Sequence, residues 1–123
     1  MLITSKQNTQ IKQARALLDA KGRHESGLFL AEGLRAVIQA MRSGAKIEKL
    51  IYAPELLISQ LGKETVSDAQ LKGVECLEVS QEVLMSLARK EKPQGILAVL
   101  AQEKPTLEGL EKSPSGLWLG VEA

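Results

Sequence analysis

Apolar runs and amphipathic stretches follow one another along the first hundred residues of the chain. Short apolar runs at 27–31, 46–53 and 74–79 have the length and the flanking turn residues of buried strands. The run 95–101 is apolar without interruption, which is typical of a strand that is covered on both faces. We therefore predict four strands, with 95–101 at the centre of the sheet.

Helical periodicity fills the intervals between these strands. Leu34, Val37, Ile38 and Met41 repeat at i, i+3, i+4 and i+7, so they form one face of a helix that ends at Gly44. The same reasoning predicts three further helical segments, at 8–21, 55–61 and 81–90.

Two stretches carry turn signals rather than periodicity. Gly22 is expected to end the first helix, so that residues 21–27 form a basic turn bracketed by glycines. The polar interval 62–73 predicts a single helical turn that begins at Ser67.

Strands that alternate with helices predict an α/β domain of three layers, α/β/α, with helices on both faces of a mixed, mostly parallel sheet. The 123 residues of the chain suffice for one such domain. We place this domain at 1–101. The polar, proline-containing segment 102–116 is typical of a linker, and the apolar segment 117–123 is expected to be the first strand of a second, truncated domain.

Charge is distributed unevenly, although the net charge is only +1. Residues 1–49 hold nine Lys and Arg against four Asp and Glu, whereas residues 50–123 hold seven against eleven. A basic half points to an anionic partner, either a nucleic acid or a membrane surface, and it is equally compatible with an unevenly solvated surface.

Cations concentrate around the first predicted turn and on the helices beside it. Arg23 is the leading candidate for a phosphate contact, because Gly22 and Gly27 let the backbone approach a ligand and a guanidinium can donate two hydrogen bonds to phosphate. The residues predicted to contact the phosphates of a nucleic acid are Lys12, Arg15, Lys21, Arg23 and Arg35.

Several classes of chemistry are excluded or disfavoured by composition. The single cysteine, Cys76, excludes an internal disulfide, and the single histidine, His24, has no partner at metal-ligand spacing, so we expect no metal site and no catalytic residue. Only three aromatic residues are present, so a bound nucleic acid would have to be recognised by backbone charge and shape. No signal peptide or membrane-length apolar run is visible, which favours a cytoplasmic protein without membrane contact.

Four short motifs in the chain resemble those of a known family. They resemble the N-terminal substrate-binding domain of SpoU-type, TrmH-like RNA 2′-O-ribose methyltransferases. The motifs are Asn8-x-x-Ile11-Lys12, Lys21-x-Arg23-x-x-x-Gly27-x-Phe29-x-x-Glu32-Gly33, Leu50-Ile51-Tyr52 and Pro93-Gln94-Gly95-Ile96-Leu97-Ala98-Val99.

The resemblance implies an L30e-like fold that holds structured RNA, expected to be ribosomal, for a knotted catalytic domain. By analogy with the family, Lys12, Lys21, Arg23 and Arg35 would help to hold this RNA. The cofactor implied is S-adenosylmethionine. No Asn or Arg follows Trp118, so the family's first catalytic motif is missing and we expect this chain alone to be inactive. Homodimers of the family form through the catalytic domain, so this chain by itself can be monomeric.

Two other functions remain open at this point. One is a stand-alone RNA-binding module similar to L30e or L7Ae proteins, without an enzyme. The other is an interaction domain whose basic surface has no specific RNA affinity, and which would show little dependence of RNA binding on salt.

Overall fold

The computed structural model describes residues 2–89 and 94–101, whose strands form one sheet in the order β1-β4-β3-β5-β2. β1 pairs with β4 and β4 with β3 in parallel, whereas β5 pairs antiparallel with both β3 and β2. The predicted mixed sheet is confirmed, with half of these pairings parallel. The strands are β1 (Leu2–Ile3), β2 (Leu28–Glu32), β3 (Ile47–Tyr52), β4 (Glu75–Val79) and β5 (Ile96–Ala101).

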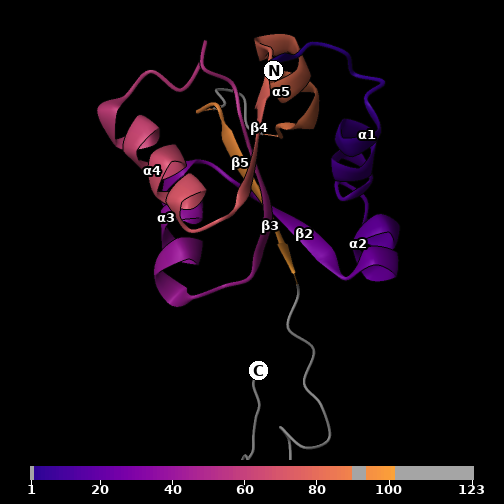
Figure 1. Cartoon of the computed structure of the whole chain (residues 1–123). Helices are drawn as coiled ribbons and strands as arrows, with labels where there is room; N and C mark the ends of the chain where they lie inside the picture. The colour runs from indigo at the N-terminus through magenta and orange to yellow at the C-terminus, as the bar shows by residue number, and fades with distance from the viewer. Residues whose placement is uncertain (1, 90–93, 102–123) are drawn as a thin grey trace, which may run out of the picture.

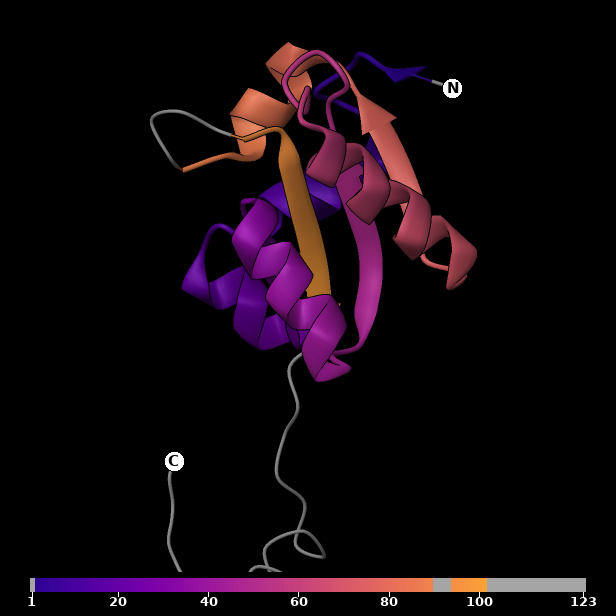
Figure 2. The ribbon, with the colours of Figure 1, turned by 90° about the vertical axis from the view of Figure 1, so that its left-hand side faces the viewer.

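Helices cover both faces of this sheet, as predicted (Figure 1). One face carries α1 and α5, with α2 beside α1, and the opposite face carries α3 and α4, which lie side by side in Figure 2. The five helices of the described part are α1 (Thr9–Ala16), α2 (Ala20–Ser26), α3 (Leu34–Ser43), α4 (Gln60–Leu71) and α5 (Gln81–Leu87).

Side chains along the inner strands point alternately to the two faces of the sheet, so the hydrophobic core has two parts. In β5, Leu97 and Val99 pack with α1 and α5, whereas Ile96, Ala98 and Leu100 pack with α3 and α4. The prediction that this strand is covered on both faces is confirmed. The middle position belongs to β3, with β5 next to it, because an apolar run reveals burial on both faces but does not rank the inner strands.

The predicted turn at 21–27 is wrong, because the chain forms helix α2 there. α1 ends before Leu17, and α2 begins after Asp19 and ends at Gly27. Gly22 lies inside α2 and against the end of α1, where a Cβ would collide with the carbonyl oxygen of Ala16. This glycine permits a close approach of two helices, instead of ending the first one.

Helix α4 was also missed, since a single turn was predicted at 62–73 and a short helix at 55–61. The structure has a helix of 12 residues that begins at Gln60. Its buried face consists of Gly62, Thr65, Val66 and Ala69. Three of these side chains are small or polar, so their helical spacing produced no apolar signal.

The predicted linker at 102–116 and strand at 117–123 lie outside the described residues. Within 2–89 and 94–101, no helix combines the length and the apolar character that crossing a membrane requires.

Candidate nucleic-acid interface

The predicted RNA-binding residues on α1 and α2 differ in how exposed their side chains are and in how many hydrogen bonds those side chains already form within the protein. Lys12 and Lys21 are exposed. Arg15 is half-buried, and its Nη2 donates to the Lys6 carbonyl oxygen at 3.2 Å and to the Ser86 Oγ at 3.1 Å. Arg15 therefore joins α1 to α5, and part of its hydrogen-bonding capacity is already used inside the protein.

Arg23 also has a structural task that the sequence did not reveal. Its Nη1 donates to the carbonyl oxygens of Leu17 and Leu18 at 3.0 and 3.1 Å, where α1 has ended and leaves carbonyl groups without helical partners. The residue is half-buried in α2 and does not sit in an open turn between flexible glycines. The prediction that Arg23 lies in an open turn is therefore wrong. Only the guanidinium nitrogens other than Nη1 can donate to a phosphate.

Arg35 belongs to the opposite layer of the domain. It is the second residue of α3, which packs with α4, and its side chain is exposed. The five predicted residues therefore do not form one cluster, because the sheet separates α3 from α1. Arg23 and Arg35 nevertheless approach the same end of β2 from its two sides.

We call this region the β2 corner and define it as Arg23, Glu32, Arg35, Arg89 and Gln94. Arg23, Glu32 and Arg89 line a hollow of about 100 Å³ on the α1 and α5 side. Arg35 and Gln94 line a wider, open hollow of about 550 Å³ on the α3 side. The corner thus carries three guanidinium groups and one carboxylate at the point where β2 ends.

Hydrogen bonds between distant segments hold the corner together. The Arg89 backbone N–H donates to Glu32 Oε1 at 2.9 Å, which ties the end of α5 to the end of β2. The Leu34 N–H donates to Gln94 Oε1 at 2.9 Å, so the side chain of Gln94 caps the first turn of α3. These bonds therefore hold the backbone at Arg89 and at the start of α3 close to the end of β2.

Arg89 and Gln94 are not among the site residues predicted from the sequence. Arg89 falls at the end of the predicted helix 81–90, and Lys90 and Lys92 follow it closely in the sequence. Gln94 is part of one of the family motifs. Only the tertiary structure shows that the Arg89 backbone bonds to Glu32 and that the Gln94 side chain bonds to the N-terminus of α3, next to Arg35.

The described residues offer no obvious catalytic group near the corner. Burial raises the pKa of the Cys76 thiol, and the nearby charge of Glu75 raises it further, so the thiol stays protonated at neutral pH. Burial likewise raises the pKa of Tyr52, with a further contribution from the charge of Glu78. No group of three or more His, Cys, Asp or Glu capable of holding a metal occurs within 2–89 and 94–101. The arrangement suits binding of an anion through charge and hydrogen bonds.

Three solved structures show what the chain is similar to. An rRNA methyltransferase from Sinorhizobium meliloti shares 32% identity over 84% of this chain and 37% of that protein, with a TM-score of 0.67, and it has also been solved with AdoMet bound. An RNA 2′-O ribose methyltransferase shares 30% identity over 87% of this chain and 40% of that one, with a TM-score of 0.75.

The third structure is the SpoU methyltransferase AviRb from Streptomyces viridochromogenes, in complex with AdoMet. It shares the fold at 22% identity, covering 84% of this chain and 36% of that one, with a TM-score of 0.66. The chain thus spans about two fifths of the length of each of these enzymes. Among curated proteins, none matches the chain significantly.

The predicted resemblance to SpoU- and TrmH-type methyltransferases is confirmed by these structures and by a family model. The model for the MRM3-like substrate binding domain matches residues 8–98, which include every residue of the β2 corner. The chain belongs to the family of MRM3-like substrate-binding domains.

Proposed function

We propose that this chain is the RNA-binding domain of an S-adenosylmethionine-dependent RNA 2′-O-ribose methyltransferase, and that its substrate is structured ribosomal RNA. The observation that carries the proposal is the β2 corner. Arg23, Arg35 and Arg89 come from three different elements and surround one end of β2 in a domain of a substrate-binding family. Solved structures similar to the chain include AdoMet-bound methyltransferases.

The corner would contact RNA through its phosphates. Guanidinium groups form paired hydrogen bonds with phosphate oxygens, and such contacts fix the position of a nucleic acid without reading its bases. Glu32 and Gln94 hold the backbone that carries Arg89 and Arg35, through their bonds to the N–H groups of Arg89 and Leu34. The domain therefore supplies affinity and orientation, so that a chosen ribose is held where the reaction takes place.

S-adenosylmethionine does not fit the corner. Its sulfonium carries a positive charge, and three arginines would repel it. When bound, this cofactor supplies the methyl group that a ribose 2′-hydroxyl attacks. We assign cofactor binding to a part of the enzyme outside residues 2–101, and we assign no step of methyl transfer to the described residues.

The salt dependence of RNA binding tests the proposal. We expect a fluorescently labelled ribosomal RNA hairpin to bind with a log K that falls against log[KCl] with a slope of about −2 to −3, because each phosphate contact contributes roughly 0.7 to 0.9. Fluorescence anisotropy measures this slope. A DNA hairpin of the same sequence serves as the control and should bind more weakly, because it lacks the 2′-hydroxyls and the A-form shape. An affinity that does not change with salt would contradict the phosphate contacts.

Calorimetry tests where the cofactor binds. Titration of S-adenosylmethionine into the 123-residue chain is expected to produce no heat of specific binding. A saturable binding isotherm would place the cofactor in this chain and would overturn our assignment, whatever the result of the RNA experiment.

A further inference from the structure

The wider hollow at the β2 corner combines apolar side chains with polar ones. Its volume of about 550 Å³ lies within the range of about 300–1,000 Å³ that is common for ligand pockets. Leu34 and Ile38 of α3 and Leu61 of α4 form its apolar part. We call it the α3 hollow and define it by these three residues together with Arg35, Gln39, Arg42 and Gln94.

The charged side chains that line the α3 hollow are both cations. Arg35 and Arg42 lie two turns apart on the same side of α3, so about 10 Å of helix axis separates them. Their side chains and that of Gln39 are exposed, and within the described part of the chain none of the three forms a hydrogen bond or an ion pair. Two guanidinium groups are thus available to phosphates along this hollow.

Gln94 supplies a hydrogen-bond donor whose position is fixed. Its Oε1 accepts from the Leu34 N–H at 2.9 Å, so the other end of the amide, Nε2, keeps its two N–H groups. None of the described residues accepts a hydrogen bond from Nε2, and the side chain lines the hollow. Every nucleobase carries an acceptor on an edge, so Nε2 suits a base as well as a phosphate.

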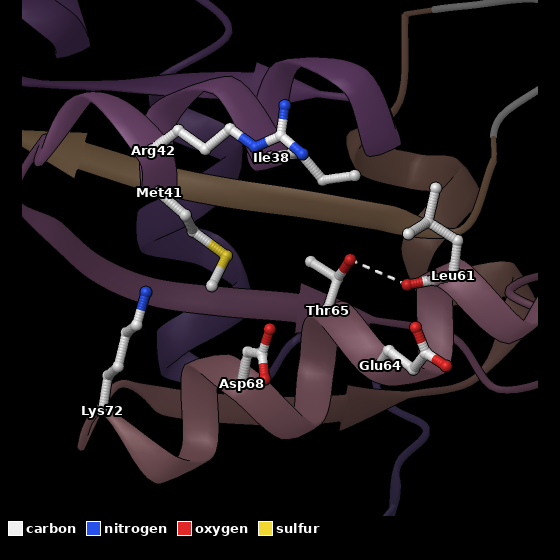
Figure 3. Close-up of a pocket in the computed structure, with 8 residues that line it drawn as sticks. All are labelled: Ile38, Met41, Arg42, Leu61, Glu64, Thr65, Asp68 and Lys72. Atoms are coloured by element: carbon white, nitrogen blue, oxygen red, sulfur yellow. Dashed lines mark hydrogen bonds between the residues drawn. The ribbon is translucent and has the colours of Figure 1, made fainter.

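A second, smaller hollow between α3 and α4 limits where phosphates can lie. Its volume is about 180 Å³, and it shares Ile38, Arg42 and Leu61 with the α3 hollow. Glu64 and Asp68 of α4 also line it (Figure 3). Because carboxylates repel phosphates at close range, we expect the RNA backbone to stay on the Arg35 side, next to the β2 corner.

An apolar surface beside cations matches the chemistry of an unpaired nucleotide. Bases of a continuous duplex are stacked and paired, so a duplex would present mainly phosphates and riboses to the hollow. A base in a loop or bulge can leave the stack, lie against apolar side chains or a guanidinium plane, and form hydrogen bonds through its edge. The apolar part of the α3 hollow has no use in binding phosphates alone.

We propose that the α3 hollow binds one unpaired nucleotide of the RNA. The base packs on the apolar side chains, its edge accepts a hydrogen bond from Gln94 Nε2, and its phosphate pairs with Arg35. This inference rests on the proposed function, because it specifies which part of an RNA the domain recognises. The domain accordingly prefers RNA with a bulge to a continuous duplex.

Two blunt-ended RNA duplexes test the proposal, one fully paired and one with the same sequence and a single bulged uridine. We expect the bulged duplex to bind the 123-residue chain about tenfold more tightly, because the nucleotide adds an apolar contact and one or two hydrogen bonds. Fluorescence anisotropy measures both Kd values. Their ratio is the readout, since phosphate contacts contribute to both duplexes.

Substitutions at two exposed positions of the hollow should lower this ratio. Leu61→Ala and Gln39→Ala are each expected to reduce it to about threefold, and Q39A/L61A to within about twofold of unity, because independent losses add. Leu71→Ala is the matched control. Leu71 is another exposed leucine of α4 and is not among the residues lining the hollow, so the ratio should stay near tenfold.

The outcomes separate this inference from the proposed function. Equal Kd values for the two duplexes overturn the unpaired-nucleotide site and leave salt-dependent phosphate contacts in place. A ratio that Q39A/L61A does not change, or that Leu71→Ala lowers equally, also overturns it. Failure to bind either duplex contradicts the proposed function and the present inference with it.

Discussion

Replacing Gly95 by alanine is expected to lower the free energy of unfolding by about 2–5 kcal/mol, which combines a strained backbone with overpacking. Gly95 has a φ of +90°, which L residues with a side chain rarely adopt. A Cβ here would lie 2.7 Å from the Cβ of Leu56 and 2.8 Å from the backbone nitrogen of Leu57. The loop after β3 cannot retreat easily, because the Ala53 N–H donates to the Gly95 carbonyl oxygen at 2.9 Å.

Gly73→Ala is the matched control for this substitution. Gly73 has a φ of +85°, but nothing lies within 4 Å of a Cβ placed there. Its replacement by alanine should therefore lower the free energy of unfolding only through backbone strain, by about 1–2 kcal/mol. Urea unfolding followed by circular dichroism measures both variants. Equal losses at the two positions would show that the contacts with Leu56 and Leu57 contribute nothing.

The Gly95 result also bears on the proposed RNA site. Gly95 follows Gln94, whose side chain caps α3 at Leu34, and precedes β5. A shift of this backbone would move the cap away from the α3 N-terminus. We therefore expect Gly95→Ala to weaken RNA binding even where the protein remains folded.

Charge reversal at the β2 corner is expected to lower RNA affinity about a hundredfold or more when Arg35→Glu and Arg89→Glu are combined. Each single change should cost roughly tenfold, because a hydrogen bond to a charged group contributes about 1.5–3 kcal/mol and independent losses add. Both side chains are exposed, and the bond from the Arg89 backbone to Glu32 does not involve its guanidinium. Fluorescence anisotropy with the ribosomal RNA hairpin measures the change.

Stability measurements separate loss of binding from loss of structure in these variants. Arg35 occupies the first turn of α3, where a glutamate interacts favourably with the positive end of the helix, so Arg35→Glu should leave Tm unchanged or slightly raised. Lys63→Glu, a reversal at an exposed position of α4, should change RNA affinity by less than about threefold through general electrostatics alone. If Lys63→Glu weakens binding as much as Arg35→Glu does, the corner is not the contact surface.

The proposed role of Arg23 differs from that of Arg35 and Arg89. Arg23 bonds the carbonyl groups of Leu17 and Leu18, so its replacement removes a structural contact together with any phosphate contact. Arg35 and Arg89 are therefore the better probes of RNA binding. Arg23 contributes first to the geometry of the link between α1 and α2.

Much of the local structure was predictable from the sequence alone. The apolar face of α3 and its end at Gly44, which has a φ of +77°, follow from the spacing of four apolar residues and one glycine. Asn8 and Ser80 cap α1 and α5 with their side chains, because short polar side chains can accept hydrogen bonds from the free N–H groups of a first turn. Such features depend only on residues within one or two helical turns along the chain, so they can be predicted from the sequence.

Tertiary contacts determined the features that the sequence pattern did not. α2 and α4 form although their buried positions are few, small or polar, and the role of Gly22 depends on the carbonyl of Ala16. The β2 corner exists because β2 pairs antiparallel with β5, which brings Glu32 opposite Leu97, and because Glu32 and Gln94 then bond to the Arg89 and Leu34 backbones. Residues about 60 positions apart meet there, and hydrophobic periodicity carries no information on which strands become neighbours.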